Sequence, residues 1–374
     1  MNKQKILGIL KNTAAIVVIL AMFVVVFYQN RDRDIFKFGK DESSELISNS
    51  QDDEESFFGG DIGKLKDEVA FLTTTAFTVI DKDSSTKSYP IAISEPILHT
   101  EGEWAACYEI DSKEVTVFKE ETQAYNIKTD NKIISAKVNK NGYLFVVTEK
   151  EGYNCECMVY NRSGEAIFKW DVSKSEFLDG DINPANNAIA ISLASAGNKK
   201  LVGEVSLIDI RTAEIINKET FDSEIFYSLN FNNNDTYTLL GNNSLTYFNS
   251  DGTKRWSYDF GKKTLVKADV SNHDTLVLAF SSSSTIVEGS STDIKIINRL
   301  GKVVAEKNYD GMIDAISKNE DSIALAFGKK IYITNGKLRE KKRVETDNSV
   351  KKMVLYEDNK HLFVLGNSGG KVIE

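Results

Sequence analysis

The sequence is poor in cysteine, proline and histidine, with three of each in 374 residues. An odd and low number of cysteines argues against a disulfide framework. A zinc site usually needs four ligands, and His99, His273 and His361 have no cysteine or second histidine at ligand spacing. The Gly-x-Ser-x-Gly motif of many hydrolases is also missing. We therefore assign no catalytic, cofactor-binding or metal-ligating residue from the sequence, and predict no cofactor and no enzyme activity.

Two of the three cysteines lie close together. Cys155 and Cys157 are at positions i and i+2 of an expected strand, so both side chains point to one face. This spacing suits a redox pair or half of a metal site, but it also suits two small packing residues. We favour packing for this pair. Cys107 stands alone.

The net charge of −9 and the isoelectric point near 5.2 make nucleic acid an unfavourable partner. An acidic surface repels the phosphate backbone. Part of the excess is local, because residues 41–61 contain Asp41, Glu42, Glu45, Asp52, Asp53, Glu54, Glu55 and Asp61.

Residues 13–29 are uncharged and almost entirely apolar, close to the minimum length for crossing a bilayer. We predict a transmembrane helix here, preceded by a short cytoplasmic tail, residues 1–12. A cleaved signal peptide is the alternative, but the run ends in bulky residues without a small-x-small site. No cysteine follows for a lipid anchor.

The orientation of this predicted helix rests on charge. Lysines and arginines lie on both sides, so their number does not decide. The tail contains three lysines and no acid, whereas Arg31 and Arg33 alternate with Asp32 and Asp34. We expect the N-terminus inside and the main domain outside, in the cell envelope.

The segment 30–64 lacks an apolar period and is rich in Asp, Glu, Ser, Asn and Lys. We predict an acidic flexible linker, because such a composition buries too little apolar surface to offset the entropy of ordering. Its acidic run suits either a binding tail or a solvated tether.

The rest, residues 65–374, consists of short alternating apolar runs separated by Asn, Asp, Gly and Ser, which is typical of strands and turns. One recurring feature is a strand, a polar turn and a strongly apolar strand. Its equivalent positions lie 39 to 49 residues apart and are Val138, Ile182, Phe231, Val270, Ile316 and Leu355. A second feature is a hairpin turn with the same drifting period, at Asn161, Asp209, Asn249, Asn298 and Asn335.

A repeat of roughly 40 to 50 residues is the blade length of β-propellers. The sequence therefore predicts an all-β propeller of four-stranded blades. We expect seven blades, with the two chain ends completing one closing blade, because no convincing inner strand precedes the hairpin near residue 80. Eight blades are the alternative, if the N-terminal strands form their own.

Two details of this pattern suggest relatives. Trp170 and Trp256 follow the turns at Gly164 and Gly252. This sequence pattern resembles quinoprotein-type and WD40-like propeller repeats. The anchor, the acidic tether, the Ala76–Asp83 hairpin and the Ser94–Leu98 step together resemble a clostridial family of single-pass membrane propeller proteins of unknown function. That resemblance covers nearly the whole chain, rests on structural motifs and implies no functional residues.

One segment has the beginning of a calcium-loop spacing, Asp179-Gly-Asp-Ile-Asn183, but it lacks the later glycine and the closing glutamate. It also falls at an expected blade-to-blade junction, where turn chemistry explains Asp, Gly and Asn, and we favour that interpretation over calcium binding. The tryptophans and most tyrosines are expected to pack between blades.

The sequence thus favours a membrane-anchored, extracytoplasmic binding or scaffold module for a protein, peptide or glycan of the cell envelope. Two alternatives are an enzyme with a site in the central channel and a sensor that signals through the transmembrane helix.

Overall fold

The computed structural model describes residues 60–374, with gaps at 198–199, 234–235, 272–274, 282–290, 321 and 368. The predicted tail, the predicted transmembrane helix and most of the predicted linker lie outside the described residues. Within them, no helix is long and apolar enough to cross a membrane.

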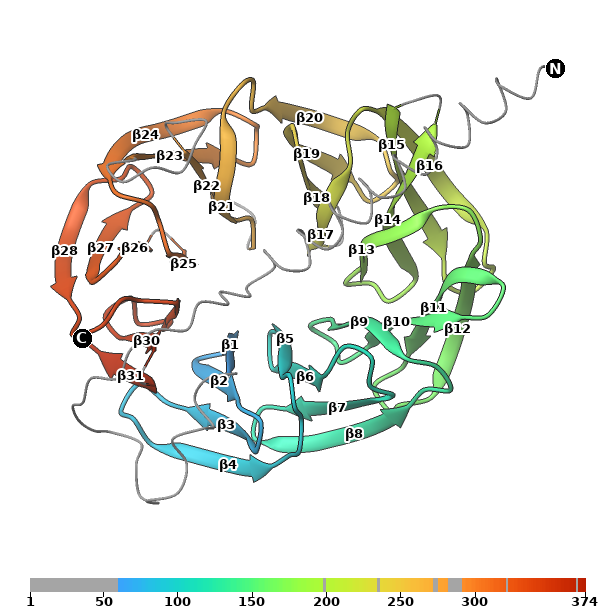
Figure 1. Cartoon of the computed structure of the whole chain (residues 1–374), viewed down its shortest axis with the longest axis horizontal. Helices are drawn as coiled ribbons and strands as arrows, with labels where there is room; N and C mark the ends of the chain where they lie inside the picture. Colours follow the sequence, from blue (N-terminus) through green and yellow to red (C-terminus); the bar gives the residue numbers. More distant parts are fainter. Residues whose placement is uncertain are drawn as a thin grey trace, which may run out of the picture.

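Eight antiparallel sheets surround a common centre, as in a β-propeller (Figure 1). We number them blades 1 to 8 in chain order. Blades 1 to 4 consist of β1 (Asp61–Leu65), β2 (Glu68–Leu72), β3 (Ala76–Ile80) and β4 (Thr86–Pro90); β5 (Ile97–Glu101), β6 (Trp104–Tyr108), β7 (Glu114–Lys119) and β8 (Thr122–Lys128); β9 (Ile133–Val138), β10 (Leu144–Lys150), β11 (Tyr153–Tyr160) and β12 (Ala166–Val172); β13 (Glu176–Ile182), β14 (Ala188–Gly197), β15 (Lys200–Asp209) and β16 (Ile215–Asp222).

Blades 5 to 8 continue the pattern. They consist of β17 (Phe226–Asn233), β18 (Thr236–Gly241), β19 (Ser244–Asn249) and β20 (Lys254–Asp259); β21 (Thr264–Asp269), β22 (Thr275–Ser281), β23 (Ser291–Asn298) and β24 (Val303–Asp310); β25 (Ala315–Asn319), β26 (Ser322–Phe327), β27 (Lys330–Asn335) and β28 (Glu340–Glu345); β29 (Lys352–Leu355), β30 (Leu362–Gly366) and β31 (Gly369–Ile373). Among the described residues, blade 8 has three strands and the other seven have four.

The prediction of a propeller is confirmed, but the preferred count of seven blades is wrong. The chain ends do not share a blade, because β1 to β4 form blade 1 and β29 to β31 form blade 8. The inner strand β1 begins at Asp61, inside the predicted linker. It is hard to recognise because only Ile62 and Leu65 of Asp-Ile-Gly-Lys-Leu are apolar, and Gly63 leaves the space that Thr100 of the next blade occupies.

Each blade buries its middle strands most deeply. In blade 3, for example, Leu144–Val147 of β10 are fully buried and pair with β9 on one side and β11 on the other. The outermost strands alternate, as in β8, where only Tyr125 and Ile127 are buried. Apolar side chains of neighbouring blades form shared cores, so burial is achieved by stacking blades around the ring.

Five-residue turns join the third and fourth strands. In four blades the first residue is asparagine. In three of them its side chain accepts amide hydrogens two and four residues later, as Asn298 does from Leu300 and Lys302. In the turn that begins at Asn249, the Thr253 amide donates to Asp251 instead. The fourth residue has a positive φ and is Gly164, Gly252, Gly301 or Leu338. A side chain at Gly301 would meet the Trp256 ring of the preceding blade at 2.7 Å. These turns therefore join neighbouring blades as well as neighbouring strands.

Candidate functional site

The inner strands carry polar side chains that bond to the next blade. The innermost strand of each sheet is an edge strand, whose backbone amides need other partners. In the described part of the ring, side chains of the preceding blade accept several of these hydrogen bonds. The pairs are Asp61 Oδ2 with Leu98 N (3.0 Å), His99 Nδ1 with Val138 N (3.3 Å), Asp179 Oδ2 with Leu229 N (2.8 Å), Asp181 Oδ2 with Phe231 N (2.8 Å) and Ser317 Oγ with Leu355 N (2.9 Å).

In blades 3 to 5, a lysine extends this arrangement. Lys137 Nζ on β9 lies 2.7 Å from Asp179 Oδ2 on β13 and 3.2 Å from the Leu229 carbonyl oxygen on β17. Only 6% of the lysine side chain and 4% of the aspartate side chain are exposed. The Asp179 Oδ1 atom is buried without a hydrogen-bond partner.

Blades 8, 1 and 2 repeat the arrangement. Lys352 Nζ on β29 lies 2.9 Å from Asp61 Oδ1 on β1, and the other oxygen of Asp61 accepts the Leu98 amide on β5. Both lysine–aspartate pairs therefore link three successive blades. We call these two sets the lysine–aspartate latches.

Two further carboxyls near Lys137 have raised pKa values. Burial, followed by repulsion from Asp181, raises the pKa of the half-buried Glu101 to about 8. Burial raises the pKa of Asp181 to about 6, although Lys137 and two backbone amides oppose the shift. Glu101 is thus largely protonated at neutral pH, a property that general acids share.

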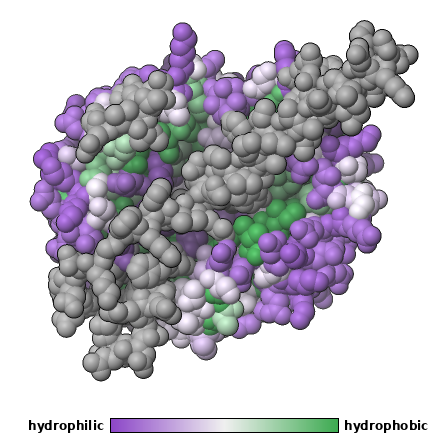
Figure 2. Space-filling view, in the orientation of Figure 1, coloured by the Kyte–Doolittle hydropathy of each residue, from purple (hydrophilic) through white to green (hydrophobic). Residues whose placement is uncertain are grey.

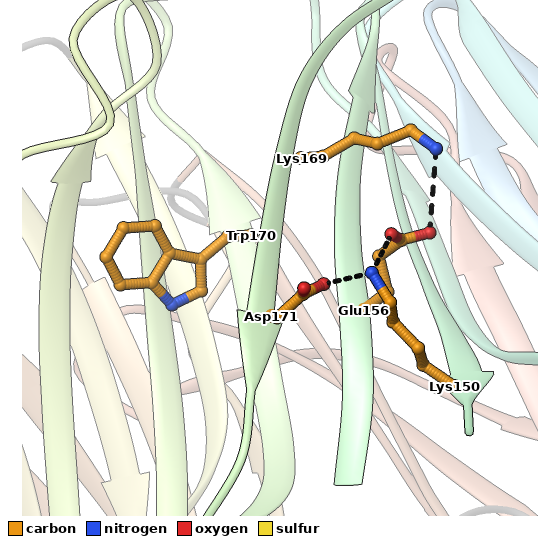
Figure 3. A pocket seen from close by; sticks show the side chains of 5 residues that line it. All are labelled: Lys150, Glu156, Lys169, Trp170 and Asp171. Atoms are coloured by element: carbon orange, nitrogen blue, oxygen red, sulfur yellow. Dashed lines mark hydrogen bonds and ion pairs between the residues drawn. The ribbon is translucent and has the colours of Figure 1, made fainter. Parts of the chain in front are cut away.

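An open pocket lies on the outer part of blade 3 (Figure 3). Glu156 and Asp171 face each other across β11 and β12, and Lys150 Nζ lies 2.7 Å from a carboxylate oxygen of each. Hydrogen bonds to Asp171 and then Glu156 hold the pKa of Lys150 above its usual value. Trp170 points away from these charges on the other side of β12. The lysine neutralises two directly opposed carboxylates, so this group stabilises the sheet.

The cysteines pack as predicted. Cys155 and Cys157 lie on β11 and belong to the core shared by blades 3 and 4, while Cys107 belongs to that of blades 1 and 2. All three are buried and free. A hydrogen bond from the Cys157 thiol to Cys155, together with burial, keeps the pKa of Cys157 well above its usual value, which favours the unreactive thiol.

The other candidates are dispersed. His99 lies on strand β5, where its Nδ1 accepts the Val138 amide. His361 Nδ1 lies 2.5 Å from Asp358 Oδ2 at a turn of blade 8, and His273 lies outside the described residues. Within the part of the chain that the structure describes, no three His, Cys, Asp or Glu side chains are grouped to hold a metal ion.

The segment with calcium-loop spacing is an inner strand and its turn. Asp179 and Asp181 lie on β13 and accept amide hydrogens from β17. Asn183 closes the following turn, accepting from the Asn187 and Ala188 amides. The prediction that this segment is a blade-to-blade turn is therefore wrong for the two aspartates, whose carboxylates serve inter-blade bonding.

The tryptophans lie between blades, as predicted. The Trp104 ring faces Gly142 of blade 3, Trp170 packs against the core of blades 3 and 4, and Trp256 Nε1 donates to the Arg299 carbonyl oxygen of blade 6 at 2.9 Å.

Exposed apolar side chains mark two places on the outside of the ring. Of the seven large apolar side chains that are exposed in the described residues, six lie in or directly after the turns before outermost strands. Ile167, Ile215 and Ile216 lie on blades 3 and 4, and we call them the aliphatic patch. Leu300, Val303 and Val304 lie on blade 6. On the face in Figure 2, by contrast, hydrophilic residues dominate the rim and hydrophobic ones show nearer the centre.

A family model described as a family of unknown function (DUF5711) matches residues 41–374. The chain belongs to this family. No curated protein matches the sequence. The membership confirms the predicted relation to a family of unknown function, and it brings no assigned activity.

Solved structures share the fold at low sequence identity. The C-terminal WD40 domain of Sif2 is 14% identical with a TM-score of 0.60, covering 85% of this chain and 95% of that one. BamB from Moraxella catarrhalis is 14% identical with a TM-score of 0.51, covering 83% and 95%. A eukaryotic initiation factor is 12% identical with a TM-score of 0.53, covering 84% and 88%. At this identity the similarity establishes the propeller fold alone.

Proposed function

We propose that this protein is a non-catalytic binding module, held outside the cell membrane by the apolar run 13–29, that docks another envelope protein on its aliphatic patch. The observation that carries the proposal is the exposure of Ile167, Ile215 and Ile216, whose side chains are 42%, 45% and 49% exposed on neighbouring blades. Exposed apolar groups at the start of the outermost strands of two neighbouring blades favour a binding surface.

The charge around the patch supports a protein partner. The turn segments 161–167 and 209–216 carry two arginines and three acids, so the surroundings are close to neutral. Arg211 is already bonded to Asp209. A nearly neutral aliphatic surface with a polar border resembles the core and rim of protein–protein interfaces.

The centre of the ring supports a structural role. The carboxylates of Asp61, Asp179 and Asp181 are engaged by backbone amides or lysines of other blades. These bonds keep the inner strands together and leave the outer surface for recognition.

A photo-crosslinking residue in place of Ile216, in cells that produce the full chain, tests the proposal. We expect a discrete crosslinked protein that is not obtained from the same residue placed at Asn126, an exposed polar position on the outermost strand of blade 2. With the photo-crosslinking residue kept at position 216, Ile167→Ser/Ile215→Ser should reduce recovery of that protein at least about tenfold, since each buried aliphatic side chain contributes more than 1 kcal/mol. Equal crosslinking at both positions, or none at residue 216, would contradict the proposal.

Catalysis at the centre of the ring is the second candidate function, and Glu101 with its raised pKa is the observation that favours it. Glu101 would serve as the proton donor and Asp181 as its neighbouring carboxyl. If this candidate holds, Glu101→Gln abolishes a hydrolytic activity of the purified chain while partner crosslinking at residue 216 persists. If the binding proposal holds, Glu101→Gln leaves crosslinking unchanged and alters only the dependence of stability on pH.

A further inference from the structure

Blade 6 presents a compact group of exposed aliphatic side chains. Leu300 is 65% exposed in the turn before β24, and Val303 and Val304, at the start of that strand, are 40% and 48% exposed. The outermost strands of blades 1 and 7, by contrast, begin with polar residues, Thr-Lys-Ser in β4 and Glu-Lys-Lys in β28. Leaving three aliphatic side chains in water is unfavourable unless another surface covers them.

The charges around this group differ from those of the aliphatic patch. The turn segments of blades 5, 6 and 7, residues 249–256, 298–304 and 335–343, carry nine lysines and arginines against two acids. All nine basic residues are exposed, and they are Lys254, Arg255, Arg299, Lys302, Lys337, Arg339, Lys341, Lys342 and Arg343. These segments have a net charge of +7 in a domain, residues 60–374, whose net charge is −7. The positive charge is therefore concentrated where Leu300, Val303 and Val304 lie.

The three turns form one surface. Trp256 of blade 5 donates to the Arg299 carbonyl oxygen, and its ring lies against Gly301. Leu338 in the turn of blade 7 is buried in the same core as Tyr309 of β24. We call the three aliphatic residues and the nine basic residues the basic rim.

We propose that the basic rim docks on the anionic surface of the lipid bilayer, with Leu300, Val303 and Val304 entering the interfacial region. Aliphatic side chains flanked by lysine and arginine are the combination that binds to such interfaces, where apolar burial and attraction to anionic lipids add. Each basic residue near an anionic bilayer contributes about 1 kcal/mol.

An acidic protein is the competing occupant, and the chain itself favours the bilayer. This argument rests on the proposed anchor at residues 13–29. Thirty residues separate that run from residue 60, which at full extension span about 100 Å. The domain would thus remain permanently within reach of the bilayer. Because the basic rim is positively charged and the domain as a whole is negatively charged, the basic rim would be the side that approaches anionic lipids.

A fluorescent probe on the full chain in lipid vesicles tests the proposal. The three native cysteines are buried, so Leu300→Cys takes an environment-sensitive label such as NBD selectively. The matched control is Ile216→Cys on the aliphatic patch. In vesicles containing phosphatidylglycerol we expect the label at residue 300, and not at residue 216, to shift to the blue and to be quenched by brominated lipids. Pure phosphatidylcholine vesicles should give neither response.

Charge reversal tests the basic residues separately. Lys302→Glu/Lys337→Glu/Lys342→Glu should lower the ratio of docked to undocked protein by on the order of a hundredfold, at about fivefold per residue. Lys174→Glu on the connection before β13 serves as the charge control and should have little effect. High salt should reverse docking of the unmodified chain, since it screens these charges.

The outcomes separate the two claims. A label at residue 300 that responds equally in both lipids, or that reports only water, overturns docking, and protection of the label by an acidic protein would then assign the rim to a protein partner. Flotation of the full chain with both kinds of vesicle reports the anchor independently. A negative result from the label at residue 300 therefore refutes docking of the basic rim but not the anchor at residues 13–29. Failure of the full chain to float with either kind of vesicle refutes the anchor.

Discussion

Removing the amine of Lys137 tests most directly how much the lysine–aspartate latches stabilise the fold. In Lys137→Met, the Asp179 carboxylate loses the charge at 2.7 Å while it remains 96% buried as a side chain. The Leu229 carbonyl oxygen loses its 3.2 Å contact as well. Removing one partner of a buried ion pair lowers the free energy of unfolding by about 3–5 kcal/mol, because the remaining charge has neither water nor a counter-ion.

For a domain of this size, that cost lowers the melting temperature by roughly 5–8 °C. Thermal unfolding of the full chain in mild detergent, followed by tryptophan fluorescence, measures it. Lys128→Met is the control, since the Lys128–Glu114 pair is exposed and such pairs contribute less than about 1 kcal/mol. Lys137→Met/Asp179→Asn should cost less than the sum of the single changes, because asparagine keeps an acceptor for the Leu229 amide without a charge. A loss for Lys137→Met no larger than that of the control would refute the reasoning.

Four further outcomes follow from the structure. Gly301→Ala should destabilise the domain by about 1–3 kcal/mol in urea unfolding, because the residue has a φ of 76° and its new Cβ would meet the Trp256 ring. The control is Gly261→Ala, which has no atom nearby and should cost only the strain of a positive φ. Lys150→Met should destabilise more than Lys169→Met, because Glu156 and Asp171 are then opposed without a bridging charge; equal melting temperatures for the two variants would contradict that role. The folded-state pKa values of Asp181 and Glu101 are raised to about 6 and about 8. The stability that their protonation provides is therefore complete below about pH 4 and is lost as the pH rises through 6 and then 8. Melting temperatures should fall over this window, and Glu101→Gln should remove the upper part of the fall. Thiol reagents should leave the folded chain unmodified at Cys155 and Cys157, and rapid labelling detected by mass spectrometry would argue against their burial between blades.

The sequence predicts the propeller well, because the turn chemistry repeats. Asn161, Asn249, Asn298 and Asn335 each begin a five-residue turn with the same backbone hydrogen bonds, so their spacing follows the blades directly. The middle strands are predicted for a related reason, since burial on both faces requires continuous apolar runs such as Leu144–Val147.

The inner strands are harder to predict because their chemistry depends on other blades. Asp61, Lys137 and Asp179 are charged residues at buried or partly buried positions of inner strands, where a pattern of alternating polarity does not predict them. Their partners lie in other blades, 291 residues away for Lys352 with Asp61 and 42 residues away for Lys137 with Asp179. For this reason the sequence pattern assigns β1 to the linker and predicts one blade too few.

The candidate surfaces were missed for a different reason. Isolated isoleucines and valines at the start of a strand look the same in sequence whether the strand is covered or outermost. The signal in the sequence is a pair of consecutive β-branched residues, Ile215–Ile216 or Val303–Val304, after a turn that begins at Asp209 or Asn298.

The central claim is that this propeller is held outside the membrane, where its surfaces meet envelope components. Protease treatment of intact, wall-stripped cells tests it most directly. The account predicts cleavage in the acidic segment 41–59 and release of a soluble fragment that begins near residue 60 and resists further digestion. Complete protection of the full chain, with cleavage only after lysis, would place the propeller in the cytoplasm and contradict the account.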